Sequence, residues 1–388
     1  MKNIGIYIHI PFCKQKCKYC DFVSFVNKES MMEDYFKCLL MEIEEKAKDY
    51  NLEIVNGIEQ KIGVNTIYIG GGTPSFVNPK YIGMVISKIK ECFKVLKTAE
   101  ITIEVNPGTV IKSKLEYYYR LGINRISIGL QSTNDRLLKM LGRIHNYSEF
   151  IDTYNLAREV GFKNINVDLM IGLPNQSTEE VKDSLEKIIN LSPEHISMYS
   201  LIVEESTAIF DLIETGKLIL PNESIEREMY WLVKRRLEEA GYKHYEISNF
   251  AKKNKESKHN MNCWKQESYL GFGTAAHSYF NGTRFSNIDN LKQYINNYLA
   301  GASVHNIIFH ENQDKTSMMK EYMMLGLRKI DGVDITKFKN KFSENPVYIF
   351  RNELNKLISE DLLEIDENSI KLTDKGLDLA NQVWIEFV

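Results

Sequence analysis

Three cysteines near the N-terminus carry the clearest chemical signal in this chain of 388 residues. Cys13, Cys17 and Cys20 are separated by three and then two residues, directly after an apolar, alternating segment that ends at Pro11. Thiolates are preferred ligands of soft metal ions and of iron–sulfur clusters. Three thiolates leave one iron of a cuboidal 4Fe–4S cluster open to an external molecule. We therefore expect the three cysteines to be cluster ligands.

Two other interpretations of the cysteines stay open at this point. A zinc site would need a fourth Cys or His nearby, and His9 lies back in the apolar segment, where a side chain more often packs. A redox role for the cysteines is the second alternative. Cys38 and Cys92 fall in helical patterns, and we expect both to be core residues outside the site.

The chain around and after the cysteines alternates between strand and helix patterns. Apolar segments typical of strands occur at residues 4–10, 65–70, 100–105, 125–130, 164–171 and 195–202. Helical patterns between them predict a parallel sheet with right-handed crossovers. Six βα units are too few for a closed eight-stranded barrel. The predicted fold class is therefore α/β, an open three-quarter (βα)6 TIM-like barrel.

The C-terminal part of the chain breaks this alternation. We expect a polar, irregular stretch at 252–270, a glycine-rich loop at 271–278 and a domain boundary within 305–315. The predicted domains are residues 1–305, a partial barrel with a C-terminal extension, and residues 316–388, a helical, winged-helix-like domain.

Composition limits the possible partners. A net charge of −3 gives no excess of basic residues for nucleic acid or an anionic membrane surface. No apolar run is long enough for a membrane span, and the N-terminus lacks a secretory signal pattern. We expect a cytoplasmic protein, in a reducing compartment that suits an open cluster. Met1 directly precedes the first predicted strand, so we expect no N-terminal extension over the site.

Polar and glycine residues follow the predicted strands at their carboxyl ends, where parallel folds place their chemistry. One glycine-rich turn alone would indicate only a tight turn, but strand after strand ends in this way. The positions are Gly71, Gly72, Thr73, Glu104, Gln131 and, within its strand, Asp168.

The cysteine spacing, with an aromatic residue before the last cysteine, resembles the radical S-adenosylmethionine (SAM) superfamily. The segments YIHIPFC and CDF narrow the resemblance to the oxygen-independent coproporphyrinogen III oxidase family. Asp21, where the oxidases carry a further cysteine, narrows it to the haem-chaperone branch of that family. The resemblance spans nearly the whole chain and implies a 4Fe–4S cluster on the three cysteines, with SAM chelated at the open iron.

The resemblance also implies which residues contact SAM. Glu104 and the glycine turn would meet the amino group, and Arg143 the carboxylate, which a guanidinium fits bidentately. A valine at Gly72 should then weaken SAM binding and leave the cluster intact. A structural ion pair for Glu104 and plain core packing for Tyr7 stay open as alternatives. The implied cofactor-binding residues are Tyr7, Gly71, Gly72, Thr73, Glu104, Gln131, Arg143 and Asp168.

A second constellation lies at residues 259–278, HNMNCWKQESYLGFGTAAHS. It resembles a stretch that is linked to haem in the haem-chaperone branch, with Cys263 where tyrosine is usual. Both His and Cys can ligate haem iron. His259 is the first candidate, His277 the second and Cys263 the third. The alternative is that His259 and Trp264 only give structure to a loop over the barrel mouth.

The function that the resemblance implies is that of a haem chaperone, which binds the cluster, SAM and haem and passes haem to a recipient protein. The sequence does not identify the recipient; respiratory proteins are one candidate class. Two enzymatic alternatives stay open: an oxygen-independent coproporphyrinogen III oxidase of porphyrin biosynthesis, and an anaerobic radical SAM enzyme that opens haem. We expect no nucleic-acid partner.

Overall fold

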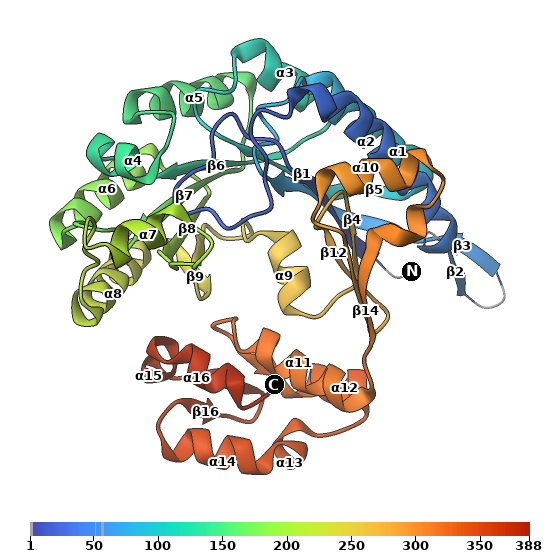
Figure 1. The fold of residues 1–388 in the computed structure, drawn as a ribbon. Coiled ribbons are helices and arrows are strands. Elements are labelled where there is room, and N and C mark those ends of the chain that lie inside the picture. Colours follow the sequence, from blue (N-terminus) through green and yellow to red (C-terminus); the bar gives the residue numbers. More distant parts are fainter. Residues whose placement is uncertain (1–2, 51, 56–57) are drawn as a thin grey trace.

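Six parallel strands form the centre of the fold (Figure 1). The computed structural model describes residues 3–50, 52–55 and 58–388. The six strands lie side by side in chain order within a 12-stranded sheet, as the alternation of patterns predicted. They are β1 (Asn3–Ile10), β4 (Gly63–Gly71), β5 (Lys94–Val105), β6 (Arg125–Gln131), β7 (Ile165–Ile171) and β8 (His195–Ser200).

Helices follow the strands and cover one face of the sheet (Figure 1). Side-chain oxygens of Asn78, Asn146 and Ser177 cap the N-termini of α2, α5 and α6, which satisfies backbone amides that have no partner within the helix. The helices of the βα part are α1 (Met32–Tyr50), α2 (Pro79–Cys92), α3 (Lys112–Arg120), α4 (Asp135–Leu141), α5 (Tyr147–Val160), α6 (Thr178–Leu191), α7 (Ala208–Glu214) and α8 (Glu223–Glu239).

Successive side chains of each strand point to opposite faces of the sheet. Ile4, Ile6, Ile8 and Ile10 of β1 are fully buried in the core that the helices complete. The residues between them belong to the other face, which is polar. Parallel sheets normally carry apolar residues on both faces, so this polar face marks the position of a site. Its members include Tyr7, Tyr68, Glu104, Ser127, Asp168, Ser197 and Tyr199.

The sheet continues beyond the βα part on both sides. On the β1 side follow β11 (Tyr269–Phe272), β12 (His277–Phe280), β13 (Thr283–Asn287) and β14 (Ile307–Asn312), and on the β8 side β10 (Asn249–Ala251) and β9 (Lys243–Glu246). The order runs from β14 at one edge to β9 at the other, so the sheet is open. Residues 307–312, which lie within the expected boundary region of 305–315, form its outer strand.

Helix α9 (Lys258–Trp264) lies where we expected irregular chain. It sits beneath the sheet in Figure 1, between the strands and the C-terminal helices. The backbone amide of His259 donates to Glu100 Oε1, and the side-chain Nδ2 of Asn262 donates to Asn65 Oδ1 at 3.1 Å. These bonds to β5 and β4 hold a helix of only two turns in place. Helix α10 (Leu291–Leu299) and the hairpin of β2 (Leu52–Val55) and β3 (Ile58–Lys61) complete this part.

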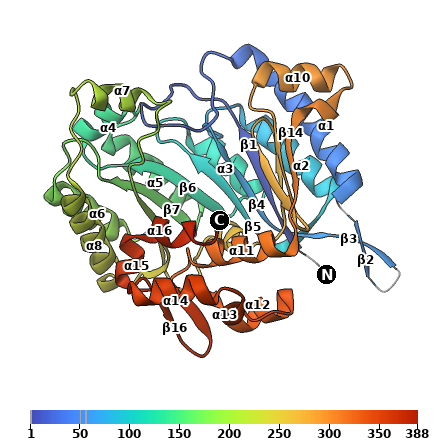
Figure 2. The same ribbon diagram turned by 60° about the horizontal axis from the view of Figure 1, so that its bottom comes forward.

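The C-terminal segment, whose helices are labelled α11 to α16 in Figure 2, builds a separate hydrophobic cluster. One of its contacts with the rest of the chain is made by Arg328, whose guanidinium carbon lies 4.5 Å from the ring centre of Trp264 and 4.4 Å from that of Trp384. The division into domains at residues 305–316 stays a prediction. Among the described helices, none has the length and apolar character needed to span a bilayer. The elements are α11 (Lys315–Gly326), β15 (Val333–Asp334), α12 (Ile335–Phe342), α13 (Pro346–Ile349), α14 (Arg351–Ser359), β16 (Leu363–Ile365), β17 (Ser369–Leu372), α15 (Asp374–Asp378) and α16 (Ala380–Ile385).

Candidate cofactor site at the strand ends

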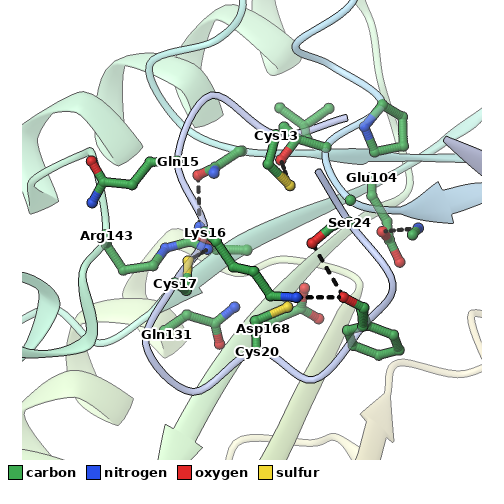
Figure 3. A pocket seen from close by; sticks show the side chains of 18 of the residues that line it. Cys13, Gln15, Lys16, Cys17, Cys20, Ser24, Glu104, Gln131, Arg143 and Asp168 are labelled. Carbon is green, nitrogen blue, oxygen red and sulfur yellow. Dashed lines mark hydrogen bonds between the residues drawn. The ribbon is translucent and has the colours of Figure 1, made fainter. Parts of the chain in front are cut away.

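The three cysteines line one cavity at the carboxyl ends of the central strands (Figure 3). Seven residues that the sequence placed in the cofactor site line the same cavity: Gly71, Gly72, Thr73, Glu104, Gln131, Arg143 and Asp168. The remaining two, Tyr7 and His259, line a second cavity next to it. The strand-end pattern therefore identified a group of residues that the fold does bring together.

Backbone hydrogen bonds hold the cysteine loop over the sheet. The loop closes on itself where the amide of Phe25 donates to the Pro11 carbonyl at 2.7 Å and the amide of Cys13 to the Phe25 carbonyl at 3.0 Å. It is tied to the C-terminal end of α4, where the amide of Lys18 donates to the Leu141 carbonyl at 2.9 Å. Because these bonds fix both ends of the loop, the thiols are presented to the cavity by a defined backbone.

The number of thiols at this cavity matches a cluster with an open iron. In the described parts of the chain, no three His, Cys, Asp or Glu side chains stand close enough together to hold one metal ion. A 4Fe–4S cluster binds each thiolate through a different iron. Three cysteines that line one cavity therefore fit such a cluster.

Burial favours the protonated form of two of the thiols, Cys13 and Cys20. It raises the pKa of Cys13, and it raises the pKa of Cys20 to about 11. The hydroxyl of Thr73 donates to Cys13 Sγ at 3.3 Å, and Arg143 Nη1 donates to Cys17 Sγ at 3.5 Å. Both donors stabilise the thiolate form, so the site is prepared for anionic sulfur ligands.

Glu104 is a buried carboxyl group with two donors aimed at it. Tyr68 donates to Oε1 at 2.8 Å, and the amide of Gly71 donates to Oε2 at 3.2 Å. Burial nevertheless raises the pKa of Glu104 to about 7. Such a carboxyl group is ready to ionise when a cation binds beside it. No salt bridge to Glu104 appears among the described residues, so the structural ion pair considered from sequence is not formed.

Arg143 lies at the centre of the cavity wall. Nη2 donates to Asn106 Oδ1 at 2.6 Å and also to the Gly129 carbonyl. Its buried Nε has no hydrogen-bond partner in the described structure. A guanidinium held in this way offers a positive charge and an unused donor, which fits an anionic ligand group such as a carboxylate.

Gln131 and Asp168 complete the far wall of the cavity. Gln131 has a positive φ of 75°, at a register shift between β6 and β7. This unusual backbone turns its side chain into the cavity, where Oε1 accepts from Tyr199 at 3.0 Å. Burial raises the pKa of Asp168, whose Oδ1 accepts from Asn166 at 2.6 Å. The sequence analysis missed Tyr199, although it follows the same strand-end rule in β8.

The structure corrects one expectation about the glycine turn. A Cβ atom at Gly72 would lie 3.0 Å from Cys13 Sγ and 3.0 Å from two backbone carbonyl oxygens. A side chain there would press directly on a cysteine of the candidate cluster site, so we expect a valine to disturb the cluster as well as SAM binding. At Gly71, φ is +109° and a Cβ would meet the His9 ring at 2.6 Å. Glycine therefore avoids a close contact with Cys13 at position 72 and with the His9 ring at position 71.

A second cavity of about 890 Å³ adjoins the first and shares Phe22, Gly71 and Glu104 with it. All three residues that the sequence proposed near haem, His259, Cys263 and His277, line this cavity. Aromatic walls come from β1, β4 and β11, through Tyr7, Tyr68 and Tyr269. The volume lies within the range of about 300–1,000 Å³ that is typical of small-molecule sites.

His259 enters this cavity from α9 as a neutral imidazole. Nδ1 lies 3.0 Å from the Thr66 hydroxyl, and burial lowers the pKa of the ring to about 4. Within the described chain, Nε2 has no hydrogen-bond partner. A neutral imidazole with one nitrogen engaged and the other unengaged is the form that ligates metals. Cys263 follows one helical turn later, and burial raises its pKa to about 11.

Comparisons with known proteins agree with this geometry. The family model described as "Radical SAM superfamily" matches residues 7–188, and "HemN C-terminal domain" matches residues 313–379. In structure, the chain is similar to coproporphyrinogen III oxidase (HemN) from Escherichia coli. The TM-score is 0.85 at 23% identity, over 100% of this chain and 90% of that one, which shows the shared fold. The open βα sheet and its strand-end cavity are thus those of a radical SAM protein.

Full-length relatives narrow the family further. "Heme chaperone HemW" of Bacillus subtilis is 36% identical over 98% of this chain and 98% of its own length. HemW of Escherichia coli K12 is 39% identical over 71% and 69%, respectively. "Radical S-adenosyl methionine domain-containing protein 1, mitochondrial" of Mus musculus is 29% identical over 98% and 86%. The chain belongs to the HemW family, and its radical SAM membership implies a 4Fe–4S cluster and SAM as cofactors.

Proposed function

We propose that this protein is a haem chaperone, which holds haem beside a radical SAM cofactor site and passes it to a recipient protein. The observation that supports this most directly is the second cavity of about 890 Å³, which is lined by three histidines and a cysteine and adjoins the cysteine-lined cavity. Full-length similarity to proteins named as haem chaperones points the same way.

In this proposal each residue that lines the cofactor cavity binds a particular part of the cluster or of SAM. Cys13, Cys17 and Cys20 hold the cluster, which supplies an open iron for SAM when bound. Glu104 and the Gly71–Thr73 turn face the amino group of SAM, Arg143 its carboxylate, and Gln131 with Asp168 its ribose and methionine portion. Tyr7, whose hydroxyl donates to His9 Nδ1 at 2.9 Å, packs at the junction of the two cavities. The hydrogen bond to His9 fixes the Tyr7 hydroxyl in the wall of the second cavity, where it would lie beside a bound ligand.

His259 is the proposed axial ligand of haem, through Nε2. The Thr66 hydroxyl at Nδ1 fixes the orientation of the ring, and its low pKa keeps Nε2 available as an electron-pair donor at neutral pH. His277 and Cys263 line the same cavity and are the second and third candidates. The recipient of haem stays unidentified, and the reducing cytoplasm is the compartment that suits these thiols.

Haem transfer with purified components tests the proposal. The anaerobically reconstituted protein is loaded with haem and mixed with an apo-haemoprotein such as apomyoglobin, and transfer is followed by absorbance. We expect stable haem binding, release of intact haem to the acceptor, and little SAM cleavage. A parallel incubation with coproporphyrinogen III, SAM and reductant should give no decarboxylated product. Multiple-turnover formation of protoporphyrinogen would reject the chaperone in favour of the oxidase, and ring-opened haem would favour a haem-degrading enzyme.

A further inference from the structure

Three large apolar side chains stand exposed around the second cavity. Phe22, Ile308 and Phe309 line it and are 62%, 59% and 44% exposed. We call these three residues the apolar rim. Single exposed apolar residues are common on proteins and need no explanation. Here, however, two segments far apart in the sequence bring exposed apolar side chains to the same cavity. A group of exposed apolar side chains of this kind marks an interaction site.

Hydrogen bonds within the cysteine loop hold the backbone of Phe22, whose side chain is exposed. Its carbonyl oxygen accepts from Lys16 Nζ at 3.1 Å and from Ser24 Oγ at 3.2 Å. These bonds fix the backbone where the loop passes the cavity. The side chain lines the cofactor cavity as well as the second cavity, so it stands between them. A hydrophobic residue held outward at this junction is placed to touch whatever fills either cavity.

The other two rim residues lie on the outermost strand. Among the described strands, β14 pairs only with β13, and all six of its residues are exposed. Exposed apolar edge strands are an aggregation liability that proteins usually avoid. The cavity between β14 and the cysteine loop offers a specific reason to keep Ile308 and Phe309 uncovered, because a ligand in it would cover them.

The lining of this cavity indicates what that ligand is. Its wall includes three tyrosines and the imidazole of His259, and its mouth carries the apolar rim. A broad, flat, apolar macrocycle matches this distribution, with its metal toward His259 and one part left at the surface. Building on the haem function proposed above, we infer that the apolar rim holds the tetrapyrrole ring by van der Waals contact with Phe22 on one segment and with Ile308 and Phe309 on the other.

The contribution of the apolar rim can be distinguished from that of the proposed iron ligand, His259. Contact with the ring does not depend on iron, whereas ligation by His259 does. Haemin and iron-free protoporphyrin IX should therefore lose affinity together when the rim is changed. The apolar contact also leaves the ring near the surface, so that it can pass to an acceptor without unfolding of the sheet.

The test compares both ligands in matched variants of the reconstituted, full-length protein. The variants are Phe22→Ser and the double variant Ile308→Ser with Phe309→Ser; Phe22→Leu keeps an apolar side chain. Val304→Ser is the control, since Val304 is 71% exposed just before β14 and does not line the cavity. We expect each serine variant to weaken binding of haemin and of protoporphyrin IX by about tenfold, with Phe22→Leu and Val304→Ser close to the parent. Thermal unfolding and iron content verify folding.

The outcomes are distinguishable. Serine variants that bind both ligands like the parent overturn the rim assignment and leave the haem function standing. Variants that bind both ligands normally but fail only in transfer to the acceptor also overturn it, because the rim would then contact a protein. A parent protein that binds neither ligand overturns the haem function itself, and the rim assignment with it.

Discussion

The phenol of Tyr68 on β4 donates a 2.8 Å hydrogen bond to Oε1 of Glu104 on the neighbouring strand β5. The bond favours the ionised carboxylate, yet burial dominates and sets the pKa of Glu104 at about 7. The charge of this residue is therefore sensitive to pH in the range where cells operate, and to the arrival of a cation.

The first prediction follows from this pKa. The amino group of SAM should donate to the ionised form of Glu104, whose negative charge also attracts the positively charged sulfonium of SAM, so SAM affinity should rise as pH increases through about 7. One unit below that pKa, binding should be weaker by about tenfold. Calorimetric titration of SAM at several pH values measures this. Glu104→Gln should bind weakly with no such rise, and Tyr68→Phe should move the rise to higher pH. An identical pH profile in Glu104→Gln would contradict the assignment.

A second prediction concerns stability without ligand. The folded-state pKa of Glu104, about 7, lies above its ordinary value of 4.5. Ionisation of Glu104 therefore costs stability, and its contribution falls as pH rises from about 4.5 to about 7. Glu104→Gln should match the parent in Tm near pH 4.5 and exceed it near pH 8. Thermal unfolding at both pH values is the measurement, and a variant that is less stable near pH 8 refutes the argument.

The third prediction concerns the cluster and the turn beneath it. Replacing Cys13, Cys17 or Cys20 with alanine should abolish the brown absorbance, because no spare thiolate is available. Gly72→Ala should also lower iron and sulfide content, since its Cβ meets Cys13 Sγ at 3.0 Å. Cys38→Ala is the matched control: this thiol is buried in the core and its loss should leave iron content unchanged. A Cys17→Ala protein with full iron and sulfide would exclude the cluster assignment.

The sequence revealed the cofactor site because its signals are local. Each glycine or polar residue stands at the end of an apolar run, and the chain order of the strands is also their order in the sheet. Tyr199 escaped notice only because the last strand, HISMYS, is polar and ends without a glycine or proline. The same strand-end rule would have included it.

The second cavity could not be predicted in the same way. Helix α9 is short and polar, and bonds from His259 and Asn262 to distant strands position it. β14 fell within the expected domain boundary, and the structure shows its residues exposed on both faces, as an edge strand allows. These elements depend on tertiary contacts, which no local pattern contains. Their positions emerge only once the sheet is assembled.

The fourth prediction ranks the haem ligands. His259→Ala should weaken haemin binding and change the Soret band, with smaller effects for His277→Ala and Cys263→Ser. Because burial lowers the pKa of His259 to about 4, ligation should persist when pH falls from about 8 to about 5. Spectroscopic titration of haemin into each variant tests this ranking. Unchanged affinity and spectra in all three variants would remove the ligand assignment.

The fifth prediction concerns the contact between the C-terminal segment and α9. Arg328 lies between the rings of Trp264 and Trp384, and cation–π contacts contribute about 0.5–2 kcal/mol each. Arg328→Met should lower the free energy of unfolding by about 1–3 kcal/mol and reduce haemin affinity, with cluster content unchanged. Lys315→Met is the control, because the exposed pair of Lys315 and Glu344 should contribute little. Equal urea midpoints for both variants would contradict this role.

The two cavities also differ in when they can form. Residues that line the first lie between Cys13 and Tyr199, whereas the second needs the chain as far as Phe309. Chains fold from the N-terminus as they leave the ribosome. The nascent protein therefore has every side chain of its cysteine-lined cavity while the ribosome is still adding α9 and β14. The residues for the cluster are therefore all present when about half of the chain has been synthesised, whereas the haem cavity requires β14, the last strand of the sheet.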